Sequence, residues 1–138
     1  MTEPERLHAL CTLAFNYAMK GEMEEASATV GLIDKEGGES GAGVVELLVG
    51  LCDTLIIAMG IERGAVIEPV LIPMDGEVTE EDRWASAMVC ARAADDEARF
   101  TELILEVPRD DPAAPWSYVR SLLLMVAFTV REIKAGQS

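Results

Sequence analysis

The segment that most restricts the fold is residues 44–60, VVELLVGLCDTLIIAMG, an apolar run that contains two carboxylates. Glu46 and Asp53 are seven residues apart, which is two turns of an α-helix, so both side chains lie on one face. Uncompensated burial of two charges is costly. The spacing therefore predicts a helix whose carboxylates are solvated, paired or metal-bound. We expect solvation first, and pairing to an arginine such as Arg92 or Arg99 second.

The same helical periodicity recurs along most of the chain. It predicts further helices over residues 4–20, 22–36, about 80–107 and about 113–135, besides a third helix over about 41–62. Helix-end signals agree with these boundaries: Gly21 ends the first helix, Thr79 and Asp82 resemble a capping box, and Asp111 is placed to cap the last helix before Pro112. The apolar face shifts around the axis near residues 95–96, which indicates a kink or a break there. The sequence thus predicts an all-α fold, a compact bundle of five to six helices, in one domain of residues 1–138.

Residues 64–78, GAVIEPVLIPMDGEV, interrupt the helical pattern between the third and fourth helices. Two prolines exclude a helix interior, yet Val70, Leu71 and Ile72 are too apolar to extend into water. We expect this extended arm to pack across the bundle or against a second subunit. The last helix is apolar on most sides, which also favours burial against a partner. Both features predict a homodimer.

Charge excludes several classes of ligand. The chain has 138 residues and a formal net charge of -14, and residues 21–111 hold 22 acidic residues against six basic ones. Such a field repels phosphates and anionic lipids, so direct binding of nucleic acid or of a membrane surface is not expected. A basic protein or a cation remains compatible with it. An acidic decoy that occupies a basic nucleic-acid-binding surface is compatible as well.

The sequence also indicates a cytoplasmic location. The polar start MTEPERLHAL lacks the features of a signal peptide. The apolar run of residues 44–61 is interrupted by carboxylates, and that of residues 121–130 is too short to cross a bilayer. Three cysteines, few and odd in number, suit a reducing compartment better than a disulfide framework.

One acidic motif raises a metal-dependent alternative. Glu22 and Glu25 are three residues apart, and the segment EMEE is similar to the E-x-x-E helix of the all-α nucleoside-triphosphate pyrophosphohydrolases. That family adds an E-x-x-D helix, but Gly50 stands where its glutamate would be needed before Asp53. The resemblance implies a Mg²⁺ or Mn²⁺ site made of Glu22, Glu25, Glu46 and Asp53. The competing interpretation is a solvated helix start that matches the helix dipole.

A zinc site is a second metal hypothesis. His8 and Cys11 are three residues apart on the first helix, and Cys52 and Cys90 would complete a set of four ligands. No Cys-x-x-Cys pair supports it. Single cysteines on apolar helical faces are more often small core residues.

The function expected from these patterns is a small acidic interaction or regulatory module without enzymatic activity or cofactor. Candidate partner-binding residues are Val70, Leu71 and Ile72 in the arm, and Trp116 and Tyr118 at the start of the last helix. For Trp116 and Tyr118, anchoring of that helix to the bundle is the alternative role.

Overall fold

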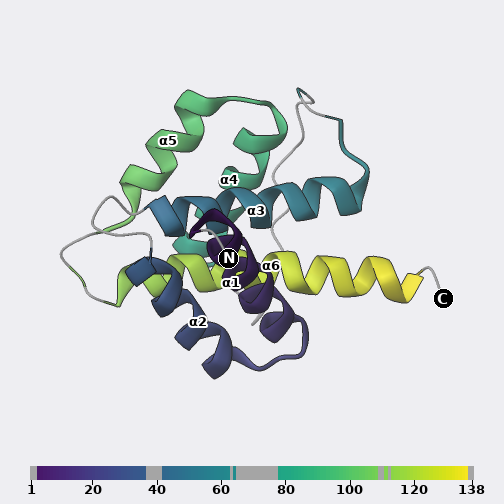
Figure 1. Ribbon diagram of the computed structural model, residues 1–138. Coiled ribbons are helices and arrows are strands. Elements are labelled where there is room, and N and C mark those ends of the chain that lie inside the picture. The colour runs from purple at the N-terminus through teal and green to yellow at the C-terminus, as the bar shows by residue number, and fades with distance from the viewer. Residues whose placement is uncertain are drawn as a thin grey trace. The chain divides into compact units, whose positions relative to one another are not determined.

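The computed structural model describes residues 3–36, 42–62, 64, 78–108, 111 and 113–136. They form six α-helices and no strand (Figure 1). The helices are α1 (Glu3–Met19), α2 (Met23–Glu36), α3 (Ala42–Met59), α4 (Glu80–Ala93), α5 (Glu97–Glu106) and α6 (Ala114–Gly136). The prediction of an all-α fold with five to six helices is confirmed. Within the described ranges, no helix is long and apolar enough to span a membrane.

The chain divides into two compact units, Met1–Leu51 and Cys52–Ser138. The division falls within α3, so each unit includes about half of that helix. We describe each unit by itself, and the single domain expected from the sequence stays a prediction.

The first unit is built on the α1–α2 hairpin. The two helices contact each other, and their small residues Ala14, Ala18 and Ala26 are at most 1% exposed. Gly21 ends α1 in the left-handed conformation, with φ of 77°. Its N–H donates to Ala18 O at 3.0 Å, and the next N–H, of residue 22, reaches residue 17 at 2.9 Å. This pattern satisfies the last carbonyls of α1 and allows the chain to reverse within a few residues.

In the second unit, α4 contacts both α5 and α6. The predicted capping box is present: Thr79 Oγ1 accepts from the Asp82 N–H at 3.1 Å, and Asp82 Oδ2 accepts from the Thr79 N–H at 3.1 Å. The predicted interruption is a complete break, since α4 ends at Ala93 and α5 begins at Glu97. Asp95 lies between them with φ of 59°, the only described residue other than glycine with positive φ.

The longest helix, α6, supplies much of the core of the second unit. Four of its side chains are fully buried: Leu122, Leu123, Val126 and Ala127. Just before the helix, Asp111 Oδ1 accepts a hydrogen bond from the Ala113 N–H at 3.0 Å. The helix itself begins at Ala114.

Candidate functional site

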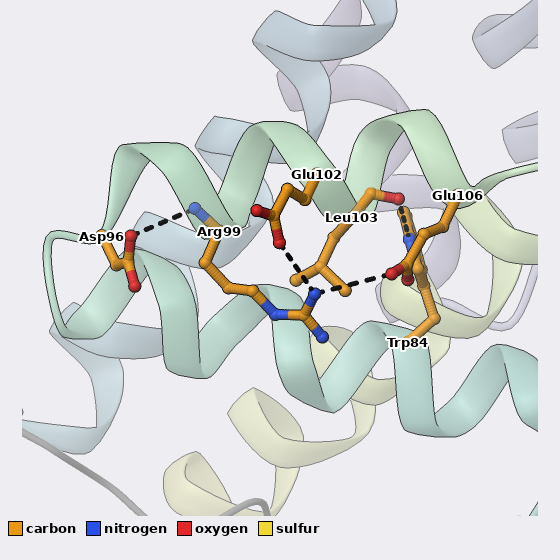
Figure 2. Close-up of polar contacts among 6 residues, drawn as sticks. All are labelled: Trp84, Asp96, Arg99, Glu102, Leu103 and Glu106. Carbon is orange, nitrogen blue, oxygen red and sulfur yellow. Dashed lines mark hydrogen bonds and ion pairs between the residues drawn. The ribbon is translucent and has the colours of Figure 1, made fainter.

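Trp84 of α4 joins the three helices α4, α5 and α6. Its indole Nε1–H donates to Leu103 O in α5 at 2.6 Å (Figure 2). Its ring meets the Tyr118 ring of α6 edge-on, with centroids 5.3 Å apart and planes at 88°. Both rings are buried. An edge-to-face pair of this kind adds about 1 kcal/mol to the free energy gained by burying the rings.

The Leu103 carbonyl can accept this bond because of its place in α5. The last four carbonyls of a helix have no regular partner within it, and Leu103 lies in the last turn of a helix that ends at Glu106. The next N–H that would regularly reach it, that of Val107, donates to Ile104 O instead. The indole therefore satisfies a carbonyl that the helix leaves open.

An acidic surface covers the exposed side of α5. Arg99 Nη1 contacts Glu102 Oε2 at 3.2 Å and Glu106 Oε1 at 3.5 Å (Figure 2). Asp96 caps the helix by accepting from the Arg99 N–H at 3.1 Å. Leu105 of the same helix is 61% exposed. Because the ion pairs are exposed, each contributes little to stability.

Asp53 pairs with Arg92 inside the second unit. Arg92 Nε donates to Asp53 Oδ1 at 2.8 Å, and Nη2 donates to Oδ2 at 3.2 Å. This pairing raises the pKa of Arg92. Both side chains stay partly solvated, at 21% and 32% exposure, so the two-point contact is worth about 1 kcal/mol. The sequence offered pairing to Arg92 as the second expectation for this carboxylate, and the structure confirms it for Asp53.

The four predicted metal ligands have different surroundings. Glu22, Glu25 and Glu46 are exposed, and Asp53 is held by Arg92. In the described ranges, no group of three or more His, Cys, Asp or Glu side chains is arranged to hold a metal ion. The metal-dependent alternative stays a hypothesis, and solvation, the first expectation, describes Glu46.

The three cysteines are free thiols. Burial raises the pKa of Cys52 to about 12, and the charge of Asp53 adds to the effect. Burial, followed by the charge of Glu46, raises the pKa of Cys11 to about 11. Burial also raises the pKa of Cys90. Thiols of this kind stay protonated at neutral pH, and are therefore poor nucleophiles.

The predicted partner-binding residues divide into two groups. Val70, Leu71 and Ile72 lie outside the described residues. Trp116 is half-buried, whereas Tyr118 is 6% exposed and packs against Trp84. For Tyr118 this contact is the anchoring role that the sequence offered as the alternative.

Sequence reasoning gave Trp84 no role. It also missed Glu80, Glu81 and Glu106, whose charges, after burial, raise the pKa of Tyr118. The sequence signal available for these glutamates was their position in the first turn of α4 and in the last turn of α5.

Comparisons with protein-family models, with curated proteins and with solved structures returned no match to this chain.

Proposed function

We propose that this chain is a non-enzymatic cytoplasmic interaction module that binds a basic protein. The supporting observation is the charge of α4 and α5. Residues 80–106 hold eight acidic residues against three arginines, and two of these arginines, Arg92 and Arg99, already pair with carboxylates of the chain. The remaining negative charge attracts a basic surface over long range and speeds the encounter.

The exposed Leu105 of α5 offers an apolar side chain in the same helix as several of these carboxylates. Interfaces commonly combine apolar contacts with a polar rim, and the charges contribute more to specificity and association rate than to affinity. A basic nucleic-acid-binding protein is one partner of this type, in which case the module acts as an acidic decoy. The proposal requires no metal or cofactor.

Capture from native lysate tests the proposal. The immobilised chain is expected to retain proteins with basic surfaces and to release them as the KCl concentration rises, because salt screens exposed charges. Partners that are acidic, or that stay bound in about 1 M KCl, would contradict it. A melting temperature raised by Mn²⁺, with loss of this shift in Glu46→Gln, would instead support the metal-dependent enzyme.

The proposed module is also a homodimer, as the apolar character of residues 64–78 suggests. Light scattering at micromolar concentration measures the mass directly. A mass close to twice the 14.9 kDa of one chain is expected, and a monomer mass would end this part of the proposal.

A further inference from the structure

The α1–α2 hairpin of the first unit carries two stripes of side chains, one along each helix. Within a stripe the residues are three or four positions apart, which places them on one side of a helix. The α1 stripe consists of Leu10, Leu13, Tyr17 and Lys20, and the α2 stripe consists of Glu22, Glu25, Thr29 and Leu32. Lys20 and Glu22 flank the turn, and backbone hydrogen bonds from Lys20 N to Asn16 O and from Ala26 N to Glu22 O continue the helical pattern through them.

Both stripes lie on the same side of the hairpin. Two members of the α1 stripe and three members of the α2 stripe come one position before a buried residue. The buried residues that follow them are Ala14 and Ala18 in α1, and Ala26, Val30 and Ile33 in α2. The stripes are therefore rotated away from the buried residues in the same sense, which in an antiparallel pair of helices leads to the same side. We name this surface the hairpin face.

The middle of the hairpin face is apolar and reaches solvent. Leu13 is 41% exposed and Leu32 is 49% exposed, while Leu10 and Tyr17 are half-buried. Single exposed leucines are common on protein surfaces, but apolar side chains that are grouped on two neighbouring helices mark a contact surface.

Charge divides the hairpin face between the two helices. Lys20 ends the α1 stripe, whereas Glu22 and Glu25 begin the α2 stripe, and all three side chains are exposed. In the part of the chain that the structure describes, none of the three forms an ion pair. The α1 side of the face is thus basic at the turn, and the α2 side is acidic there.

This division makes the hairpin face complementary to a second copy of itself. A two-fold axis parallel to the helices lays α1 of one chain over α2 of the other, in antiparallel direction, and keeps each residue at its distance from the turn. Lys20 of one chain then lies over Glu22 and Glu25 of the other. Leu13, eight residues before Gly21, lies over the stretch from Thr29 to Leu32, eight to eleven residues after it. The symmetry repeats every contact, and the four helices form a bundle.

We propose that the hairpin face is the contact surface of a homodimer in which two α1–α2 hairpins form a four-helix bundle. This inference rests on the homodimer of the proposed function and names the residues that make it. The leucines supply the apolar contact, and the opposite charges fix which helix lies over which, because the alternative pairing of α2 with α2 brings glutamates together.

Sedimentation equilibrium of the full chain at about 0.15 M KCl tests the apolar contact. The double variant Leu13→Ala, Leu32→Ala is expected to raise the dissociation constant of the dimer at least about tenfold, because each chain loses both leucines. Leu105→Ala removes an exposed leucine of α5, outside the hairpin face, and is the matched control. It is expected to change the constant by less than about twofold.

An exchange of charges between the helices tests the pairing. Lys20→Glu places acidic groups on both sides of each contact, and Glu22→Lys, Glu25→Lys places basic groups there, so each variant alone is expected to associate at least about tenfold more weakly than the intact chain. An equimolar mixture of the two variants is expected to recover a dimer that contains one chain of each. Recovery in the mixture also establishes that both variants are folded.

The outcomes separate the surface from the dimer. An intact chain that is monomeric at micromolar concentration would overturn the hairpin face together with the proposed homodimer. A dimer that the leucine variant leaves as tight as before would overturn the hairpin face alone and leave a dimer formed through other residues. A mixture that associates no better than its components would overturn the pairing of α1 with α2.

Discussion

A single side chain, Trp84, organises the second unit at the residue scale. It satisfies a backbone carbonyl of α5 and packs its ring against Tyr118 of α6. Loss of the hydrogen bond would leave the Leu103 carbonyl as an unsatisfied buried acceptor. Loss of the ring contact would remove packing against Tyr118. Substitution with phenylalanine separates them, because it keeps an aromatic ring and removes the donor.

We expect Trp84→Phe to lower the free energy of unfolding by about 1–3 kcal/mol, because the Leu103 carbonyl loses its partner. Urea denaturation followed by circular dichroism measures the change. Trp116→Phe is the matched control, since Trp116 is half-buried and has no hydrogen bond to another described residue. Equal losses for both variants would show that the Trp84 bond contributes nothing specific.

Alkaline pH should destabilise the fold through Cys52. Its pKa is raised from 9.0 to about 12 in the folded chain, so the folded state keeps a proton that the unfolded state releases. The stabilisation is complete below pH 9 and is lost as the pH rises from 9 to about 12, by at most about 1.4 kcal/mol per pH unit. Urea denaturation across this range should show a weaker pH dependence for Cys52→Ala. The same dependence in both proteins would exclude Cys52 as the cause.

At the scale of the element, three helices end with the same pattern of hydrogen bonds. Gly21 and Gly60 end α1 and α3 with positive φ, and Asp95 takes this position after α4. The N–H of Asp95 donates to Arg92 O at 3.1 Å, and the N–H of the next residue donates to Ala91 O at 2.9 Å. The left-handed conformation is unfavourable for residues with a Cβ, although Asp tolerates it better than most.

Asp95→Gly should therefore raise the free energy of unfolding, by up to about 1 kcal/mol, because glycine adopts this conformation without strain. Asp95 also raises the pKa of Arg92 through its charge, so Asp95→Asn serves as the control that removes the charge alone. Chemical denaturation of the three proteins measures the difference. If Asp95→Gly is no more stable than Asp95→Asn, the backbone conformation is not the source of strain.

The contact between α3 and α4 through Asp53 and Arg92 can be measured by a double-mutant cycle. Asp53→Asn, Arg92→Gln and the double variant should give a coupling energy of about 1 kcal/mol, consistent with a two-point but partly solvated pair. A coupling energy near zero would mean that solvent fully replaces the contact.

At the scale of the whole molecule, the net charge of -14 opposes folding. Raising KCl from about 0.01 to 0.15 M shortens the screening length from about 30 to 8 Å. We expect the melting temperature to rise by about 4 °C, which corresponds to roughly 1 kcal/mol for a chain of this size. Differential scanning calorimetry measures it. A melting temperature that falls with added salt would show that attractive ion pairs outweigh the repulsion.

The sequence by itself determined the helices and their ends. Periodicity, the capping box at Thr79 and Asp82, the break near Asp95 and the turn at Gly21 all depend on residues within one or two turns of each other, where the physics is local. The same local patterns showed that Glu46 and Asp53 share one face.

Only the tertiary structure decided which side chains meet across helices. Asp53 and Arg92 are 39 residues apart, and Trp84 and Leu103 are 19 apart. The sequence named Arg92 as one of two possible partners, but it did not identify the bond from Trp84 or the three glutamates whose charges help to raise the pKa of Tyr118. These contacts depend on how helices rotate and pack against each other, and that rotation is set by the burial of the whole core and not by any short segment.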